Sequence, residues 1–163
     1  MNQQLRTVRT DYYHNHDAPA ANSVKPAAAV AIVCNNRVLL VRRHDNGKWT
    51  LPGGTLEMTE SMPQCAVREI KEETSIDVEI IDLLGTYTDP DIRIAYSDGE
   101  VRREFTIVYL ATTTSTEVRI DSESSEYRWF TISALAEADV AQSQRKRLND
   151  LIRYLETGEK RYA

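Results

Sequence analysis

A helical segment with two opposed faces constrains the fold of this chain more than any other stretch. The segment covers residues 61–74, SMPQCAVREIKEET. At about 100° per residue, its small and apolar stripe comprises Ala66, Val67, Ile70 and Thr74. The nearly opposite stripe carries the carboxylates of Glu69, Glu72 and Glu73. An apolar stripe of this kind is buried against another element, so the helix is expected to lie on a core.

The clustered carboxylates leave two interpretations open. Three glutamates on a helix are usually a solvated face. However, Glu69 and Glu73 are like charges at a spacing of four, which opposes helix formation by a few tenths of a kcal/mol. They also lie late in the helix, where the dipole favours cations. A divalent cation, which prefers oxygen ligands, would reverse both effects.

Composition narrows the class of protein. The 163 residues fit one domain, and the net charge of −5 argues against binding nucleic acid or an anionic membrane through bulk charge. The two cysteines, Cys34 and Cys65, are far apart in sequence, which indicates reduced thiols and a cytoplasmic location. No apolar run approaches the ~20 residues of a membrane span, and the first residues lack a signal-peptide pattern.

The remaining pattern mixes strands and helices without the regular alternation of a doubly wound sheet. Residues 1–24 are predicted as an extension, either mobile or docked, and residues 25–163 as the folded domain. His14 and His16 in the extension are more often plain surface than metal ligands. We expect strands at 26–34, 37–43, 77–89, 91–97, 101–113 and 127–132. A second helix is expected to carry Leu148, Leu151, Ile152 and Leu155, and to end before Gly158.

Short signals fix the ends of several elements. Asn35–Asn36 and Asp98–Gly99 predict hairpin turns. Ser61 with Gln64 has the pattern of a capping box at the start of the helix. Before the helix, the glycine pair Gly53–Gly54 lets the main chain turn sharply or approach a ligand closely.

The segment from Gly54 to Ile76 resembles the signature of the Nudix hydrolase family. Gly54 is followed after five residues by Glu60, and seven residues later by REIKEETSI, which begins at Arg68. Each fixed position of the signature matches except its last glycine, which here is Ser75. The flanking VLLVRR, W-x-LPGG and YRWF agree with the family's usual context, and the resemblance covers roughly residues 25–157. It implies an α/β fold, a mixed β-sheet sandwiched between helices, with the signature forming a loop–helix–loop.

The resemblance also implies a reaction and a division of roles. Family members hydrolyse a nucleoside diphosphate linked to another moiety, with Mg²⁺ or Mn²⁺. By the family pattern, the metal ligands are the Gly54 carbonyl, Glu69, Glu72 and Glu73. Arg68 and Glu60 would hold the loop–helix–loop in shape, and Ser75 would end the helix in a left-handed conformation or in some local variant of it.

Further site residues follow from position and chemistry. Gly53 and Gly54 are expected to approach the substrate, and Arg42 or Arg43 is expected to clamp a phosphate. Two candidates stand for the general base, Glu72 in the helix and Glu123 near the C-terminus, and Glu123 is preferred to its neighbour Glu126.

The substrate stays open between ADP-ribose-like compounds, nucleotide sugars and nucleoside triphosphates. Specificity is expected outside the signature, where Tyr87, Pro90, Tyr96 and Trp49 are candidate contacts. The alternative function is a non-catalytic module that binds or senses a nucleotide metabolite, and a metal-dependent isomerase on the same fold is a third. The expected partner is a small-molecule nucleotide, without nucleic acid or membrane, and the sequence is compatible with a homodimer.

Overall fold

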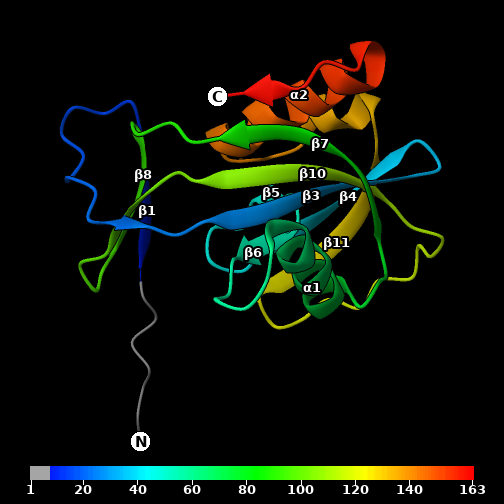
Figure 1. Cartoon of the computed structure of the whole chain (residues 1–163), viewed down its shortest axis with the longest axis horizontal. Helices are drawn as coiled ribbons and strands as arrows, with labels where there is room; N and C mark the ends of the chain where they lie inside the picture. Colours follow the sequence, from blue (N-terminus) through cyan, green and yellow to red (C-terminus); the bar gives the residue numbers. More distant parts are fainter. Residues whose placement is uncertain (1–7) are drawn as a thin grey trace, which may run out of the picture.

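The computed structural model describes residues 8–163, and residues 1–7 of the predicted extension lie outside the described residues. Two sheets and two helices organise the chain (Figure 1). The main sheet has the strand order β11 (Ser124–Thr131), β4 (Arg37–Arg43), β3 (Ala27–Cys34), β10 (Thr106–Thr112), β7 (Glu79–Tyr87) and β12 (Arg161–Tyr162). The short strands β5 (Trp49–Thr50) and β6 (Gly53–Thr55) pair with β4 and β3. The second sheet has the order β1 (Arg9–Tyr13), β8 (Ile92–Tyr96), β9 (Val101–Arg103) and β2 (Ser23–Val24).

The main sheet is mixed and lies between helices. Its central strand β3 runs parallel to β10 and antiparallel to β4, while β10 and β7 are antiparallel. The helices α1 (Met62–Thr74) and α2 (Gln142–Thr157) lie on opposite sides of this sheet (Figure 1). A short 3₁₀ helix, η1 (Ser133–Glu137), connects β11 to the α2 side. The predicted fold class is therefore confirmed. Among the described residues, no helix combines the length and apolarity that crossing a membrane requires.

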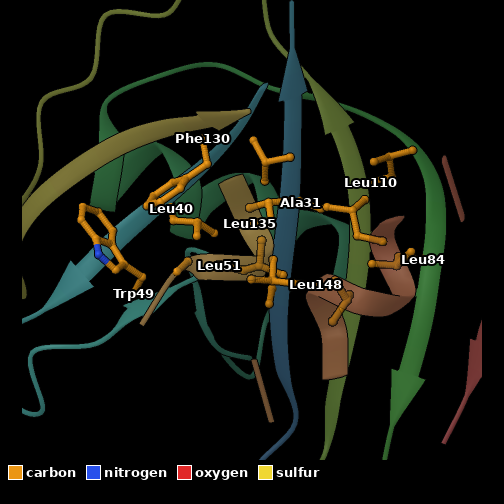
Figure 2. Packing of buried hydrophobic residues seen from close by; sticks show 14 of the residues in the cluster. Ala31, Leu40, Trp49, Leu51, Leu84, Leu110, Phe130, Leu135 and Leu148 are labelled. Atoms are coloured by element: carbon orange, nitrogen blue, oxygen red, sulfur yellow. The ribbon is translucent and has the colours of Figure 1, made fainter. Parts of the chain in front are cut away.

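Strand β3 is buried on both faces and divides the core in two. Ala29 and Ala31 face one cluster, which includes Leu148 of α2. Figure 2 shows Ala31 and Leu148 in this cluster. Val30 and Ile32 face the other cluster, which lies under α1. The continuous apolar run of this segment fits a strand of this kind, because neither of its faces meets water.

Helix α1 begins as predicted. Ser61 is the N-cap, and the reciprocal bonds between Ser61 and Gln64 form a capping box. The predicted apolar stripe is wrong at Val67, which is 40% exposed, and Cys65, which lies outside that stripe, is fully buried. The cause is β6, which covers the helix on the Cys65 side, and the Cys65 thiol donates to the Gly54 carbonyl. Burial raises the pKa of the Cys65 thiol to about 11.

Both predicted hairpin turns are present. Asn35 and Asn36 have positive φ values of 50° and 56° between β3 and β4, and Gly99 has a φ of 96° between β8 and β9. Consecutive left-handed residues are typical of a tight turn that matches the twist of the strands.

The single strand predicted for residues 101–113 is wrong. The chain leaves β9 at Arg103 and enters β10 at Thr106, and these strands belong to different sheets. Glu104 lies between them, 8% exposed, and its carboxylate accepts a hydrogen bond from Arg147 at 2.8 Å. The segment contains neither Gly nor Pro to mark the change of sheet.

The second sheet recruits part of the segment that was predicted as an extension. Strand β1 pairs along its length with β8, with Arg9 opposite Tyr96 and Tyr13 opposite Ile92. Strand β2 pairs with β9. This sheet stands at one end of the main sheet (Figure 1).

Candidate active site

The glycine pair and helix α1 meet at very close range. A Cβ at Gly53 would overlap main-chain atoms of Ala28 and Ala29, so β6 can approach β3 only with glycine there. A Cβ at Gly54 would overlap the carboxylate of Glu69. The absence of both side chains therefore allows the main chain of β6 to lie directly against the acidic face of α1.

Two of the helix carboxylates converge beneath this main chain. Glu73 is 8% exposed, and its carboxylate accepts a hydrogen bond from the Gly53 amide at 3.2 Å. The pKa of Glu73 is raised to about 8, mainly by burial and to a smaller extent by Glu69, Asp121 and Glu123, although the Gly53 hydrogen bond opposes the shift. Burial also raises the pKa of Glu69, although the Arg68 guanidinium partly opposes the shift. Two desolvated carboxylates thus share one small region.

Arg68 ties the loop before the helix to the helix itself. Its Nε donates to Glu60 at 2.8 Å, and its other nitrogens donate to the Thr55 carbonyl and to Glu69. The hydrogen bonding of Arg68 to Glu60 is the main cause that lowers the pKa of the Glu60 carboxyl to about 2. Glu72 lies farther out, with its side chain 58% exposed and a hydrogen bond from Arg68 at 3.1 Å. Glu72 is thus set apart from the buried pair Glu69 and Glu73.

A cleft opens over the buried carboxylates. It consists of two adjoining cavities of about 960 and 710 Å³, and both are lined by Arg43, Gly53, Glu73 and Glu123. Arg43 forms an ion pair with Asp45, which is the main cause of its raised pKa. Glu123 belongs to the loop before β11 and contributes to the raised pKa values of Glu69 and Glu73. The loop therefore brings a further carboxylate to the same region.

Arg42 lies differently from its neighbour Arg43. It lines neither cavity, and its guanidinium binds the Gly47 carbonyl at 2.7 Å and Glu126 at 3.3 Å. Successive residues of β4 point to opposite faces, so only one of the two arginines can face the cleft. Glu126 also pairs with Arg128, as expected for a structural residue.

Most of the aromatic candidates for substrate contact are buried. Trp49 is 7% exposed and packs edge-on against Phe130 at 5.1 Å (Figure 2). Tyr87 is 1% exposed and donates its hydroxyl to Asp150. Pro90 is exposed and lines neither cavity, whereas Tyr96 and part of Trp49 line the smaller one.

Sequence reasoning missed part of the cleft wall. Arg9, Asp11 and Tyr13 of β1 line both cavities. The alternation of these side chains within RTDYY was the available signal, but five residues in a polar segment do not show which sheet they join. Elsewhere, His14 groups with Asp89 and Asp91, but His14 and Asp91 are exposed and Asp91 already pairs with Arg93.

The donor set at the glycine pair fits a hard divalent cation. Glu73 is buried, and among residues 8–163 no lysine, arginine or histidine forms an ion pair with it. The nearby donors are carboxylate oxygens of Glu69 and Glu73 and the main chain of Gly54, all of which suit Mg²⁺ or Mn²⁺. Such an ion would also remove the cost of burying two carboxylates together.

The fold and this site define a class of hydrolase in which a helix presents carboxylates to a glycine-rich strand. Comparisons with known proteins identify the family. The model of the NUDIX domain matches residues 24–151. A MutT-like protein of Streptomyces ambofaciens is 33% identical over 120 residues, covering 74% of this chain and 71% of the relative.

Two further relatives agree. An ADP-ribose pyrophosphatase of Methanocaldococcus jannaschii is 32% identical over 134 residues, covering 79% of this chain and 75% of the relative. The crystal structure of a Nudix hydrolase from Nitrosomonas europaea superimposes with a TM-score of 0.70 at 26% identity, covering 85% of this chain and 76% of that one. The chain belongs to the Nudix hydrolase family, and it is an enzyme of the pyrophosphohydrolase type.

Proposed function

We propose that this protein hydrolyses the diphosphate linkage of a nucleoside diphosphate derivative with the help of Mg²⁺ or Mn²⁺. The observation that carries the proposal is the convergence of Glu69 and Glu73 on the Gly53–Gly54 main chain at the floor of a cleft. A diphosphate needs a site of this kind, because its charge repels both a nucleophile and a protein of net charge −5.

The roles of the residues follow from where they lie. Glu69, Glu73 and the Gly54 carbonyl would hold the metal ion, and Glu72 could join them by turning away from Arg68. A bound divalent ion neutralises phosphate charge and makes a water molecule more acidic. Arg43, which faces the cleft, would bind a phosphate oxygen, and the Gly53 main chain would let the phosphates lie close.

Glu123 is our candidate for the general base. In the reaction, a water oxygen bonds to phosphorus, the anhydride P–O bond breaks, and the water proton passes to a carboxylate. Glu123 lines both cavities together with Glu73, whereas Glu72 lines only the smaller one, is exposed and is bonded to Arg68. The substrate classes we retain are ADP-ribose-like compounds, nucleotide sugars and nucleoside triphosphates, of which the M. jannaschii relative supports the first. A small-molecule partner, a cytoplasmic location and a homodimer stay predictions from sequence.

Metal dependence is the first prediction. Purified protein is incubated with ADP-ribose, nucleotide sugars, dinucleotides and nucleoside triphosphates, and release of AMP or phosphate is measured. We expect hydrolysis of at least one class with Mg²⁺ or Mn²⁺, no hydrolysis in excess EDTA, and recovery when the metal is restored. Full activity in EDTA would refute the metal role.

The alternative is a module that binds a nucleotide without cleaving it. Such a module has no need of the full set of signature carboxylates, and here Glu69, Glu72 and Glu73 are all present. Tight, metal-dependent binding across the same panel without any product would favour this alternative.

A further inference from the structure

One face of the second sheet forms a wall of the cleft. Directly opposed residues of paired strands share a face. By the strand register, this rule places Arg9 with Tyr96, Asp11 with Ile94, and Ile94 with Arg102. The residues of this inner face that line the smaller cavity are Arg9, Asp11, Tyr13, Ile92, Ile94, Tyr96 and Arg102.

The other face of the sheet contributes less to the cleft. Thr10, Tyr12, Ala95 and Val101 of that face line neither cavity, whereas Arg93 and Arg103 line the smaller one. The wall is therefore made mainly by the inner face of the sheet.

The centre of the wall carries flat groups stacked on one another. The Arg102 guanidinium lies over the Tyr96 ring, with its central carbon 4.7 Å from the ring centroid. Glu100 holds Arg102 in this position, accepting a hydrogen bond from it at 2.9 Å and pairing with Lys25 at 2.8 Å. The aliphatic side chain of Ile94 lies directly opposite Arg102 on the paired strand.

These groups suit a nucleobase better than another phosphate. Nucleobases stack on aromatic rings and on guanidinium planes, whatever their hydrogen-bonding edges. A phosphate site instead needs cations without partners. On the inner face Arg9 is bound by Asp11 at 2.7 Å and Arg102 is bound by Glu100, so the positive charge of that face is already compensated.

The wall is close to the acidic end of the cleft. Arg9, Asp11 and Tyr13 line the same cavities as Arg43 and Glu73. Arg43, Glu73 and Tyr96 all line the smaller cavity. One nucleotide can therefore place its phosphate near Arg43 and its base near Tyr96.

We propose that the inner face of the second sheet, centred on the Tyr96–Arg102 stack, is the subsite that binds the nucleobase of the substrate. This inference rests on the proposed function and adds to it, because it assigns substrate selection to strands outside the family signature. Strand β1, from the N-terminal segment, then forms part of the substrate site.

The test measures binding in the absence of catalysis. AMP, GMP and UMP contain the same phosphorylated ribose as ribose 5-phosphate. The difference between the affinity for a nucleotide and the affinity for ribose 5-phosphate therefore measures the contribution of the base. Equilibrium dialysis without divalent metal is done with the full chain. We expect at least one nucleotide to bind at least tenfold more tightly than ribose 5-phosphate. Tyr96→Ala should weaken that nucleotide about tenfold and leave ribose 5-phosphate unchanged.

Matched variants separate the ring from the fold. Tyr12→Ala removes an aromatic ring from the opposite face of the same sheet and should change neither affinity. Tyr96→Phe keeps the aromatic ring and should retain base binding. Arg102→Lys keeps the positive charge but removes the planar guanidinium group, so it should weaken base binding. If Tyr96→Ala does not fold, Tyr96→Leu removes the ring while keeping most of its volume, and the same loss is expected.

Several results would overturn the subsite. One is a wild-type protein that binds no nucleotide more tightly than ribose 5-phosphate. Another is a folded Tyr96 variant whose nucleotide affinity stays within twofold of wild type, or which loses both ligands equally. Hydrolysis is scored separately. Cleavage without base-dependent binding refutes only the subsite, and base binding through Tyr96 without cleavage refutes only the hydrolase function.

Discussion

Neighbouring glutamates of one helix face acquire different properties in this fold. From the sequence, Glu69, Glu72 and Glu73 are equivalent members of a cluster. In the structure β6 covers Glu69 and Glu73, while Glu72 stays exposed beside Arg68. The family signature names all three, but their burial depends on where β6 packs, which is a long-range contact that helical spacing does not encode.

Glu73→Gln should separate catalysis from folding. The amide has the same size and retains an oxygen that can accept the Gly53 hydrogen bond, so the fold should be kept. Loss of one charged ligand should lower kcat by about a hundredfold or more, since metal assistance contributes several kcal/mol. In EDTA the variant should melt at or above the wild-type temperature, because it no longer buries a charge.

The control is Glu156→Gln, at an exposed position near the end of α2. It should keep the wild-type kcat and melting temperature. Thermal melts with and without Mg²⁺ complete the test, because only proteins that retain Glu73 should be stabilised strongly by the ion. A Glu73→Gln enzyme with wild-type kcat would remove Glu73 from the site.

At the scale of elements, the end of α1 shows how a single departure from the family pattern is tolerated. Ser75 has φ 62° and ψ 7°, which is the left-handed conformation expected of the family glycine. Its amide donates to the Lys71 carbonyl at 3.0 Å, and its hydroxyl donates to the Arg119 carbonyl at 3.3 Å. The hydroxyl bond to the following segment compensates in part for the strain of a left-handed serine.

Substitutions at Ser75 should resolve these two contributions. Ser75→Gly removes the strain and the hydroxyl bond together, so we expect a gain in the free energy of unfolding of at most about 1 kcal/mol. Ser75→Ala keeps the strain and loses the bond, so it should cost about 1 kcal/mol. Urea denaturation measures both, and kcat should hardly change in either. An alanine variant more stable than the glycine variant would contradict this account.

Elements with strong local signals were predictable, and those defined by distant partners were not. Strand β4 has the predicted bounds, and α2 ends before Gly158 as expected. The bend at Glu104 and the pairing of β1 with β8 depend on contacts between segments remote in sequence. The same limit applies to the site. An aromatic residue such as Trp49 or Tyr96 carries no local sign of whether its ring packs inward or lines a cleft.

At the scale of the whole molecule, the two core clusters serve different purposes. The cluster that contains Leu148 joins α2 to the main sheet, on the face of the sheet away from α1 (Figures 1 and 2). The cluster that contains Ile70 lies between α1 and the other face of the same sheet. The position of Glu69 and Glu73 relative to the glycine pair therefore depends on the second cluster, while the first contributes mainly stability.

A pair of truncations in the two clusters tests this division. Ile70 and Leu148 are both fully buried, so Ile70→Ala and Leu148→Ala should each lower the free energy of unfolding by about 2–5 kcal/mol. Ile70 immediately follows Glu69, and a cavity beneath α1 lets the helix settle and shifts both carboxylates away from β6. Measured well below each melting temperature, kcat should fall about tenfold or more in Ile70→Ala and stay within twofold in Leu148→Ala. If Ile70→Ala does not fold, Ile70→Val, with an expected cost of about 0.5–1.5 kcal/mol, should show a smaller loss of kcat in the same direction. Equal losses of kcat in the two alanine variants at matched stability would show that the site depends on the whole core and not on the cluster beneath the helix.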